Sequence, residues 1–283
     1  MRESTNPVMR GVVRDNQNPG GYAGFGAGMQ GAQSAMLDQQ VDPYARAGVP
    51  VGQRALTIDD VVTKTATTLG VLIASAAVSY GLVHANNGLA FPLLLIGGLG
   101  GLIMVLIASF GRKQDNPGIV LTYAGLEGLF VGSISYVFAN FVVSGVSAGV
   151  LIGQAILGTF GVFAGMLVVY KTGAIRVTPR FTRMLFAAMV GVMVLILGNL
   201  VVSLFNGGSG LGLYDGGPVA IAFSLFCIGL AAFSFLIDFD SADRLIRAGA
   251  PAKAAWGIAL GLTVTLVWLY VEILRLLSFI NSD

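Results

Sequence analysis

Apolar residues along this chain form seven long blocks that are separated by short polar segments. Their approximate limits are 64–85, 90–110, 118–141, 149–171, 183–205, 218–239 and 253–278. Each block is close to the ~20 residues that an α-helix needs to cross a bilayer. The pattern therefore predicts seven transmembrane helices.

The segments between the blocks are short and rich in Gly, Asn or Pro, as in HANNG, GRKQDNPG and NGGSGLGLYDGGP. Short connections favour consecutive helices that lie side by side and run in opposite directions. We therefore predict one all-α bundle over residues 56–283. Glycines such as Gly97, Gly153 and Gly161 are expected to let helix backbones approach closely.

Composition supports an integral membrane protein. Hydrophobic residues make up 55% of the chain and charged residues only 11%, with a mean hydropathy of +0.81; a soluble domain of this length carries more charge. The bilayer is thus the first expected partner, and no nucleic-acid partner is expected. One cysteine, Cys227, and one histidine, His84, disfavour a disulfide framework, a zinc hydrolase and a haem protein. No cofactor is expected.

Residues 1–55 differ from the rest of the chain. They are rich in Gly, Gln, Asn and Pro and show no apolar period, which is typical of a segment that cannot bury a core. We interpret them as a disordered cytoplasmic tail that offers short motifs to a protein partner. Thr57, in LTIDD, is expected to cap the first helix.

Lysine and arginine positions predict the orientation of the bundle. Of the 16 such residues, all but Arg275 lie in the tail, at the start of the first block, or after the second, fourth and sixth blocks. Because the side richer in Lys and Arg is normally cytoplasmic, the amino terminus should be cytoplasmic and the carboxyl terminus external.

Apart from the acids at the end of the sixth block, two acidic residues lie within the apolar blocks. Glu127 is about nine residues into the third block, or ~14 Å along a helix. It is either protonated and hydrogen-bonded where it lies, or part of a proton or cation relay. Glu272 precedes Arg275 by three residues in the seventh block, and this spacing favours a pair within the helix.

Asp238 and Asp240 lie at the end of the sixth block. Two residues apart on a helix, they point to roughly opposite faces, so only one can readily face the bundle interior. Asp240 and Arg244 are spaced i,i+4, which also allows a solvated salt bridge. Acids at a hydrocarbon border are costly unless paired or hydrated, so both are candidate functional residues.

The order of several short motifs resembles the transmembrane Bax inhibitor motif family. These are the FD pair that ends in Asp240, the LGL at 260–262, the ILR thirteen residues later at 273–275, and GLEGLFVGSIS in the third block. The beginning, MRESTNPVMRG, is similar to the actinobacterial branch. The resemblance implies helices around a central seventh helix.

The resemblance also implies a function. It implies a pH-sensitive leak channel for calcium or another cation in the bacterial plasma membrane, not an enzyme, gated by an aspartate pair in helices six and seven. Asp240 matches the first aspartate and is the expected metal ligand. Thr265 falls where the family has the second, and Asp238 is a possible second charge. We expect Asp240 to face helix seven and contact Thr265, or to pair with Arg244.

Another interpretation is a non-conducting adaptor, in which the bundle and tail bind another membrane protein such as a protease. An intramembrane hydrolase fits poorly, because the sequence shows neither a Ser-His pattern nor two aspartates on facing mid-membrane helices. Ion flux is the property that separates the first two interpretations.

Overall fold

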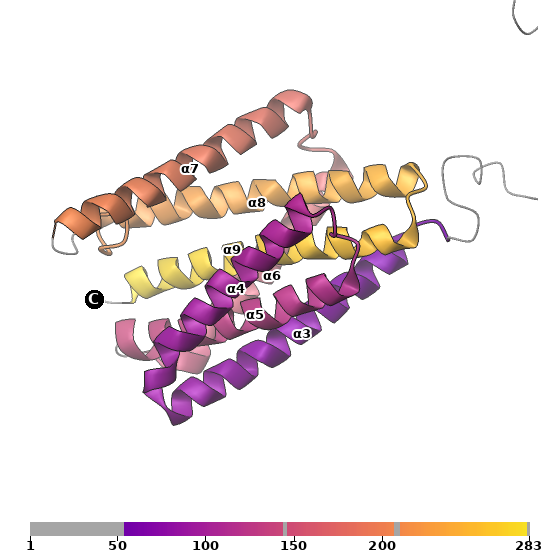
Figure 1. Cartoon of the computed structure of the whole chain (residues 1–283). Helices are drawn as coiled ribbons and strands as arrows, with labels where there is room; N and C mark the ends of the chain where they lie inside the picture. Colours follow the sequence, from indigo (N-terminus) through magenta and orange to yellow (C-terminus); the bar gives the residue numbers. More distant parts are fainter. Residues whose placement is uncertain (1–53, 144–145, 207–209, 282–283) are drawn as a thin grey trace, which may run out of the picture. The chain divides into compact units, whose positions relative to one another are not determined.

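Seven long helices make up most of the described chain, as the hydrophobic pattern predicts. The computed structural model describes residues 54–143, 146–206 and 210–281 (Figure 1). Each long helix is long and apolar enough to cross a membrane. They are α3 (Ile58–Ala85), α4 (Ala90–Phe110), α5 (Pro117–Val137), α6 (Ala148–Thr172), α7 (Pro179–Phe205), α8 (Pro218–Arg247) and α9 (Ala255–Ile280). The predicted disordered tail lies outside the described residues, except for residues 54 and 55.

Local sequence explains where the helices begin. The Thr57 hydroxyl accepts a hydrogen bond from the Asp60 amide (3.3 Å), and the Asp60 carboxylate accepts one from the Thr57 amide (3.0 Å). This reciprocal capping confirms the expected start of α3. Prolines open α5, α7 and α8, since their fixed φ suits the first helical position. Short segments η3 (Asn87–Leu89), η4 (Phe138–Val142) and η5 (Ala252–Ala254) complete the helical elements of the described residues.

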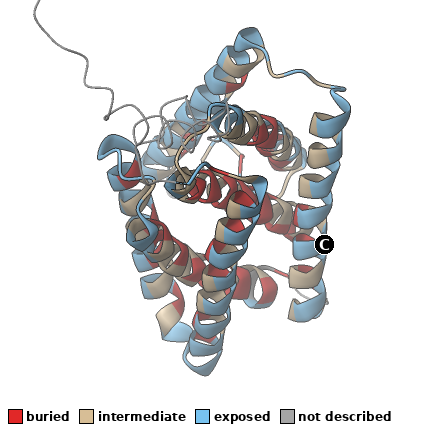
Figure 2. Cartoon of the chain, turned by 90° about the vertical axis from the view of Figure 1, so that its right-hand side faces the viewer, coloured by how far each residue is buried: buried red, intermediate tan, exposed pale blue. Residues whose placement is uncertain are grey.

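Helix α9 is the centre of the bundle, which confirms the expected role of the seventh helix. It packs against α3, α5, α6 and α8. Of its most apolar window 67% is buried, compared with 11% for α6. Figure 2 shows the buried positions gathered on the inward faces of the helices, with exposed positions outside. Residues on α9 therefore decide what the interior of the bundle contains.

Helices α3 and α5 form the tightest pair. The Ser75 hydroxyl donates to the Gly125 carbonyl (2.6 Å), and the Ser79 hydroxyl donates to the Leu129 carbonyl (2.8 Å). At Gly128 an added Cβ would lie 2.6 Å from the Ser75 Cβ, so only glycine allows this approach. The prediction that consecutive helices are neighbours is wrong here, because α5 packs between α3 and α4.

Glycines on α4 and α6 behave differently. At Gly97 of α4 an added Cβ would lie 2.7 Å from the Leu126 carbonyl of α5, which confirms close packing. At Gly153 and Gly161 of α6, no described atom outside the local helix lies within 4 Å of such a Cβ. The expectation of close backbone approach is therefore wrong for these two positions.

Helix α7 is peripheral and packs mainly against α8 (Figure 1). Its buried residues are Leu185, Val192 and Asn199. The Asn199 side-chain oxygen accepts a hydrogen bond from the Leu211 amide (2.6 Å), which holds the α7–α8 connection against α7. The rest of α7 presents apolar side chains outward, as a lipid-facing helix does.

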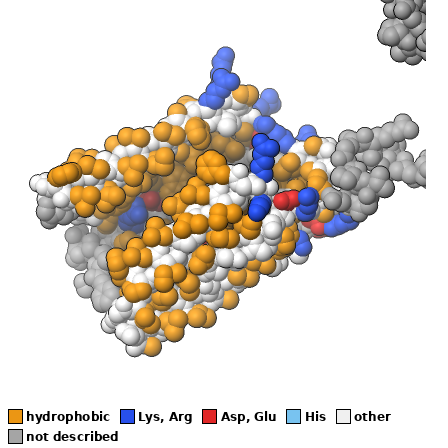
Figure 3. Space-filling model, viewed as in Figure 1, with side chains coloured by type: hydrophobic (Ala, Val, Ile, Leu, Met, Phe, Trp, Pro, Cys, Tyr) orange, Lys and Arg blue, Asp and Glu red, His pale blue; other side chains and the backbone are white. Residues whose placement is uncertain are grey.

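One end of the bundle, here named the basic end, holds the connections α4–α5, α6–α7 and α8–α9. Figure 3 shows Lys and Arg gathered near this end, with apolar side chains covering much of the remaining visible surface. Backbone hydrogen bonds join the segment before α3 to the α8–α9 connection, from the Leu56 amide to the Ala250 carbonyl (2.8 Å) and from the Ala252 amide to the Arg54 carbonyl (2.9 Å). The Lys64 ammonium lies 5.0 Å from the centre of the Trp256 ring.

Candidate functional site at the basic end

The acids near the end of α8 all lie on regular helix. The helix continues to Arg247, eight residues beyond the predicted limit at 239, so the acids project from a fixed scaffold. Asp240 pairs with Arg244, and Asp243 pairs with Arg247 at 2.9 Å, both with i,i+4 spacing. The predicted Asp240–Arg244 salt bridge is therefore present.

Asp238, and not Asp240, faces α9. The Thr265 hydroxyl donates a hydrogen bond to Oδ2 of Asp238 at 2.8 Å. Asp238 lies three residues after the fully buried Phe235 and seven after Ala231, on the face that packs toward the core. The expected Asp240–Thr265 contact is wrong, because two residues of helix turn Asp240 about 200° away from this face.

The Asp238 carboxyl group lies beside Gly261 of α9, at a distance that would be ordinary van der Waals contact for a side chain there. Gly261 lies one turn before Thr265, and a Cβ added there would be 3.6 Å from Oδ1 of Asp238. The Thr265 hydroxyl also lies 3.2 Å from the Gly261 carbonyl. Thr265 is buried, whereas Asp238 is only partly buried and keeps access to a pocket.

This pocket has a volume of about 460 Å³ and lies between the end of α4, the α4–α5 connection, α8 and α9. Asp238 lines it from α8, and Gly257 and Gly261 line it from α9. The remaining polar lining residues are Ser109, Arg112, Gln114, Asp115 and Ser241. Carboxylate, amide and hydroxyl oxygens from three elements thus surround one cavity, which is the donor type that hard cations prefer.

Charges of both signs line the pocket. Arg112 and Asp115 come from the α4–α5 connection, opposite Asp238. The Lys253 ammonium lies 2.7 Å from the Asp115 carboxylate and holds the pKa of that group below its ordinary value of 3.8. Asp115 is therefore ionised at neutral pH, and the Lys253 contact joins the α4–α5 connection to the start of the α9 segment.

Glu127 lies apart from this pocket. It is on α5 and directs its carboxylate toward α4, where the space beside Gly101 receives one of its oxygens. Tyr123, one turn earlier on α5, also approaches Gly101. Tyr123 belongs to an apolar cluster with Leu260 of α9. The structure thus places Glu127 between two helices but does not bring it to Asp238.

Glu272 forms the expected pair with Arg275 inside the bundle. One Arg275 nitrogen, Nη1, donates to both Glu272 oxygens at 2.9 and 3.0 Å. Only 4% of Glu272 is exposed. The Arg275 guanidinium also lies 4.8 Å from the centre of the Tyr214 ring. Glu272 is seven residues, ~10 Å, along α9 from Thr265, so it does not complete the Asp238 site.

The pocket combines acidic and basic groups. Among the described residues, no group of three or more His, Cys, Asp or Glu side chains is placed to hold a metal ion. Asp240, the expected metal ligand, is instead paired with Arg244. Asp238 and Asp115 supply two carboxylates to one pocket, with Arg112 beside them. Such an arrangement suits a cation that enters and leaves.

Comparison with known proteins defines the family of the chain. The family model of Bax inhibitor 1 like proteins matches residues 6–282. The chain belongs to the Bax inhibitor 1-like family. An uncharacterized protein of Chlamydia muridarum (strain MoPn / Nigg) is similar to this Bax inhibitor 1-like protein, with 31% identity over 133 residues. That match covers 46% of this chain and 49% of the chlamydial protein, so it spans about half of that relative.

Sequence reasoning missed three pocket residues of this Bax inhibitor 1-like protein. Arg112, Gln114 and Asp115 belong to the connection GRKQDNPG, to which the sequence pattern assigns no role in a functional site, although they line the pocket opposite Asp238. A signal was available, because this connection and the α8–α9 connection lie at the same end of any seven-span bundle. A contact between the opposite charges of Asp115 and Lys253 could therefore be expected from the sequence.

Proposed function

We propose that this protein is a pH-sensitive leak channel for calcium or another cation in the bacterial plasma membrane, gated by Asp238 at the basic end. Membership of the Bax inhibitor 1-like family supports the leak. The observation that carries the assignment of the gate is the Asp238–Thr265 hydrogen bond, which joins α8 to the central helix beside a polar pocket.

The ligand chemistry supports a cation as the transported species. Asp238 and Asp115 are the two acids that line the pocket, and Ser109, Gln114 and Ser241 add neutral oxygens. Calcium binds oxygen ligands and tolerates irregular geometry. Two carboxylates give weak binding, which suits an ion that has to leave again.

Apolar packing next to the pocket supports a closed resting state. Ala108 immediately precedes the pocket residue Ser109, and it packs in one buried cluster with Val120, Tyr123 and Leu260. Apolar constrictions stop ion flow by excluding water. Opening therefore requires α9 to move relative to α4 and α5, and the Asp238–Thr265 bond resists any such movement that also separates α9 from α8.

The charges around Asp238 support a pH response. A hydrogen bond to an ionised carboxylate is roughly twice as strong as a neutral one, so protonation of Asp238 weakens its hold on Thr265. The other charged groups that line the pocket are Arg112 and Asp115. Neither loses its charge near neutral pH, because arginine stays protonated and Lys253 stabilises the Asp115 carboxylate.

The orientation is part of the proposal. The excess of Lys and Arg at the basic end supports a cytoplasmic position for it, with the amino terminus inside and the carboxyl terminus outside. Reporter fusions at both ends test this orientation in cells. Two termini on the same side would contradict it.

The test of the channel is calcium flux into liposomes that contain the purified full-length protein. Wild type should leak calcium with a rate that depends on pH between about 6 and about 8. Asp238→Asn removes the charge at nearly constant shape, so its leak should be larger at neutral pH and nearly independent of pH. Asp240→Asn is the matched control, and it should behave as wild type, because Asp240 pairs with the exposed Arg244.

The outcomes separate the two functional interpretations. An unchanged pH response in Asp238→Asn would remove Asp238 as the gate. No flux from any variant, wild type included, would instead favour the adaptor interpretation, in which the protein binds another membrane protein through its tail.

A further inference from the structure

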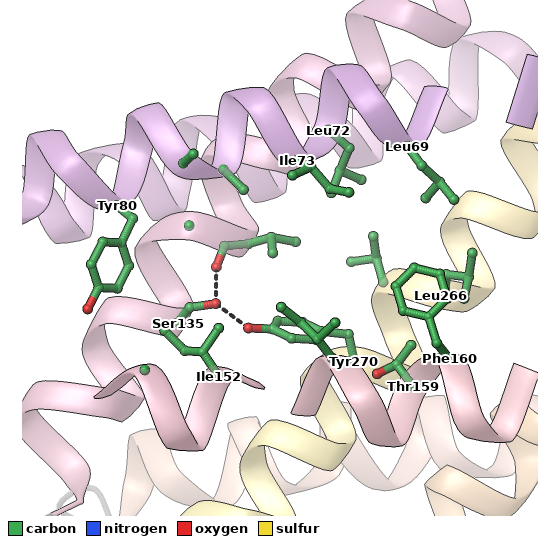
Figure 4. Close-up of a pocket in the computed structure, with 17 residues that line it drawn as sticks. Leu69, Leu72, Ile73, Tyr80, Ser135, Ile152, Thr159, Phe160, Leu266 and Tyr270 are labelled. Atoms are coloured by element: carbon green, nitrogen blue, oxygen red, sulfur yellow. Dashed lines mark hydrogen bonds between the residues drawn. The ribbon is translucent and has the colours of Figure 1, made fainter. Parts of the chain in front are cut away.

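A second pocket, larger and almost entirely apolar, lies between α3, α5, α6 and α9 (Figure 4). Its volume is about 520 Å³, within the ~300–1,000 Å³ range of small-molecule sites. Leu69 and Tyr80 of α3 mark its two ends along that helix, and Phe160 of α6 and Leu266 of α9 face them across the cavity. The polar pocket at the basic end shares none of these residues.

The Ser135, Tyr270 and Thr159 hydroxyl groups in the wall are already bonded to the protein. The Ser135 hydroxyl donates to the Val131 carbonyl at 2.6 Å and lies 2.7 Å from the Tyr270 hydroxyl. The Thr159 hydroxyl donates to the Ala155 carbonyl at 2.7 Å. No lining residue carries a charge. The wall therefore favours an apolar occupant that makes no hydrogen bonds.

The pocket opens on the lipid-facing surface. Its lining residues Ile73, Ile156 and Phe160 are 57%, 43% and 46% exposed. All three lie within helices that are apolar enough to cross a membrane. In a bilayer, hydrocarbon chains surround these side chains, so lipid has direct access to the cavity.

The dimensions match one leaflet. Leu69 and Tyr80 are eleven residues apart on α3, which is ~16 Å along a helix, about half of the ~30 Å hydrocarbon core. A transmembrane helix from a second copy would need a groove across the whole hydrocarbon core of the bilayer, whereas this cavity extends across about half of that thickness.

The Tyr80 end of the pocket lies away from the basic end. The Tyr80 ring packs edge-on against Tyr136 at 5.3 Å between centroids, and the Tyr136 hydroxyl donates to Asn87 in the connection that follows α3. Tyrosines gather at the level where hydrocarbon meets water. The cavity therefore extends from this interface toward the middle of the membrane.

We propose that this pocket binds one acyl chain of a phospholipid from the leaflet opposite the basic end. The chain enters between α3 and α6 and lies along α3, with its carboxyl-ester end near Tyr80. This binding does not depend on ion conduction. It does place the lipid against Leu266, the residue that follows Thr265 on α9.

Photolabelling tests the proposal directly. The full-length protein is reconstituted in nanodiscs that contain a phosphatidylglycerol with a diazirine in one acyl chain, irradiated, and mapped by mass spectrometry. Adducts should be more abundant on the pocket faces of α3 and α6 than on α7, whose exposed apolar face reports non-specific contact with lipid.

Variants that fill the pocket supply the control. Ala77→Phe places a ring in the cavity from α3 and should lower pocket labelling about tenfold, as expected when about two methylene groups lose their burial. Val78→Phe is the matched variant, because Val78 is 60% exposed and does not line the pocket; it should label as wild type. Gly149→Phe, where a Cβ meets no described neighbour within 4 Å, repeats the test from α6.

Equal labelling of pocket and α7, or pocket labelling that neither Ala77→Phe nor Gly149→Phe reduces, would overturn the proposal. An unlabelled pocket in a protein that is dimeric in the nanodiscs would overturn it in favour of a second copy. Calcium flux is not part of the readout, so failure of the lipid site and failure of the channel are separate results.

Discussion

The Thr265 hydroxyl of α9 donates a hydrogen bond of 2.8 Å to the Asp238 carboxylate of α8. This bond is the polar link between the central helix and the helix that carries the acids of the basic end. A carboxylate acceptor makes it stronger than a bond between neutral groups. Its position beside the polar pocket makes it the natural point at which to perturb the proposed gate.

Replacing Thr265 should therefore open the channel more often. Thr265→Val keeps the branched shape and removes the donor, so calcium leak into liposomes should rise about tenfold or more, the value of one hydrogen bond to a charged group of about 1.5–3 kcal/mol. Thr265→Ser keeps the hydroxyl and should leak as wild type. A higher leak from Thr265→Ser than from Thr265→Val would mean that side-chain volume, and not the hydrogen bond, controls the closed state.

Gly132 should not tolerate a side chain. An added Cβ would lie 2.8 Å from the Ser79 Cβ and would also clash with the Ala76 carbonyl of α3. We expect Gly132→Ala to destabilise the protein by about 1–3 kcal/mol, measured as a lower melting temperature in detergent. Gly125→Ala, where no described atom lies within 4 Å, should be neutral or slightly stabilising. A Gly132→Ala variant as stable as Gly125→Ala would contradict the close α3–α5 contact.

Replacing one partner of the buried Glu272–Arg275 pair should destabilise the protein more than replacing both. Arg275→Met leaves the buried Glu272 carboxylate without its cation and should cost about 3–5 kcal/mol. The double variant Glu272→Gln with Arg275→Met removes both charges and should recover much of this loss. Thermal unfolding of the three proteins measures the difference, and a double variant less stable than Arg275→Met would refute the argument.

The Asp115–Lys253 contact should stabilise the basic end in a pH-dependent way. Because Lys253 lowers the Asp115 pKa below 3.8 in the folded protein, the stabilisation is present above that value and is lost as the pH falls below it. Wild type should thus be more stable than Asp115→Asn at pH about 6, and the difference should vanish toward pH about 3. A difference that stays constant over this range would contradict the ion pair.

The spans and the central helix could be predicted because they follow from hydrophobic length and from the family pattern. The Glu272–Arg275 and Asp240–Arg244 pairs could be predicted because both partners lie on one helix, where spacing fixes distance. Each of these features depends on a single helix or on its length alone.

The Asp238–Thr265 contact could not be predicted in the same way. It depends on how far α8 is rotated about its axis, and the alternation Asp238-Phe239-Asp240 leaves that rotation undefined. Packing decides it, because Phe235 is fully buried and carries Asp238 inward with it. The α3–α5 pairing was missed for a related reason, since loop length says nothing about a contact made by Ser75 and Gly128.

The pair of backbone hydrogen bonds between residues 54–56 and 250–252 has a mechanical consequence. Tension applied to the chain on the amino-terminal side of Arg54 is transmitted first to the α8–α9 connection and only then to the first turn of α3. The α8–α9 connection leads directly into Lys253 and the helix that carries Thr265. A protein that bound the amino-terminal segment would therefore act first on the α8–α9 connection, so that partner binding and the proposed gate would share one mechanical linkage.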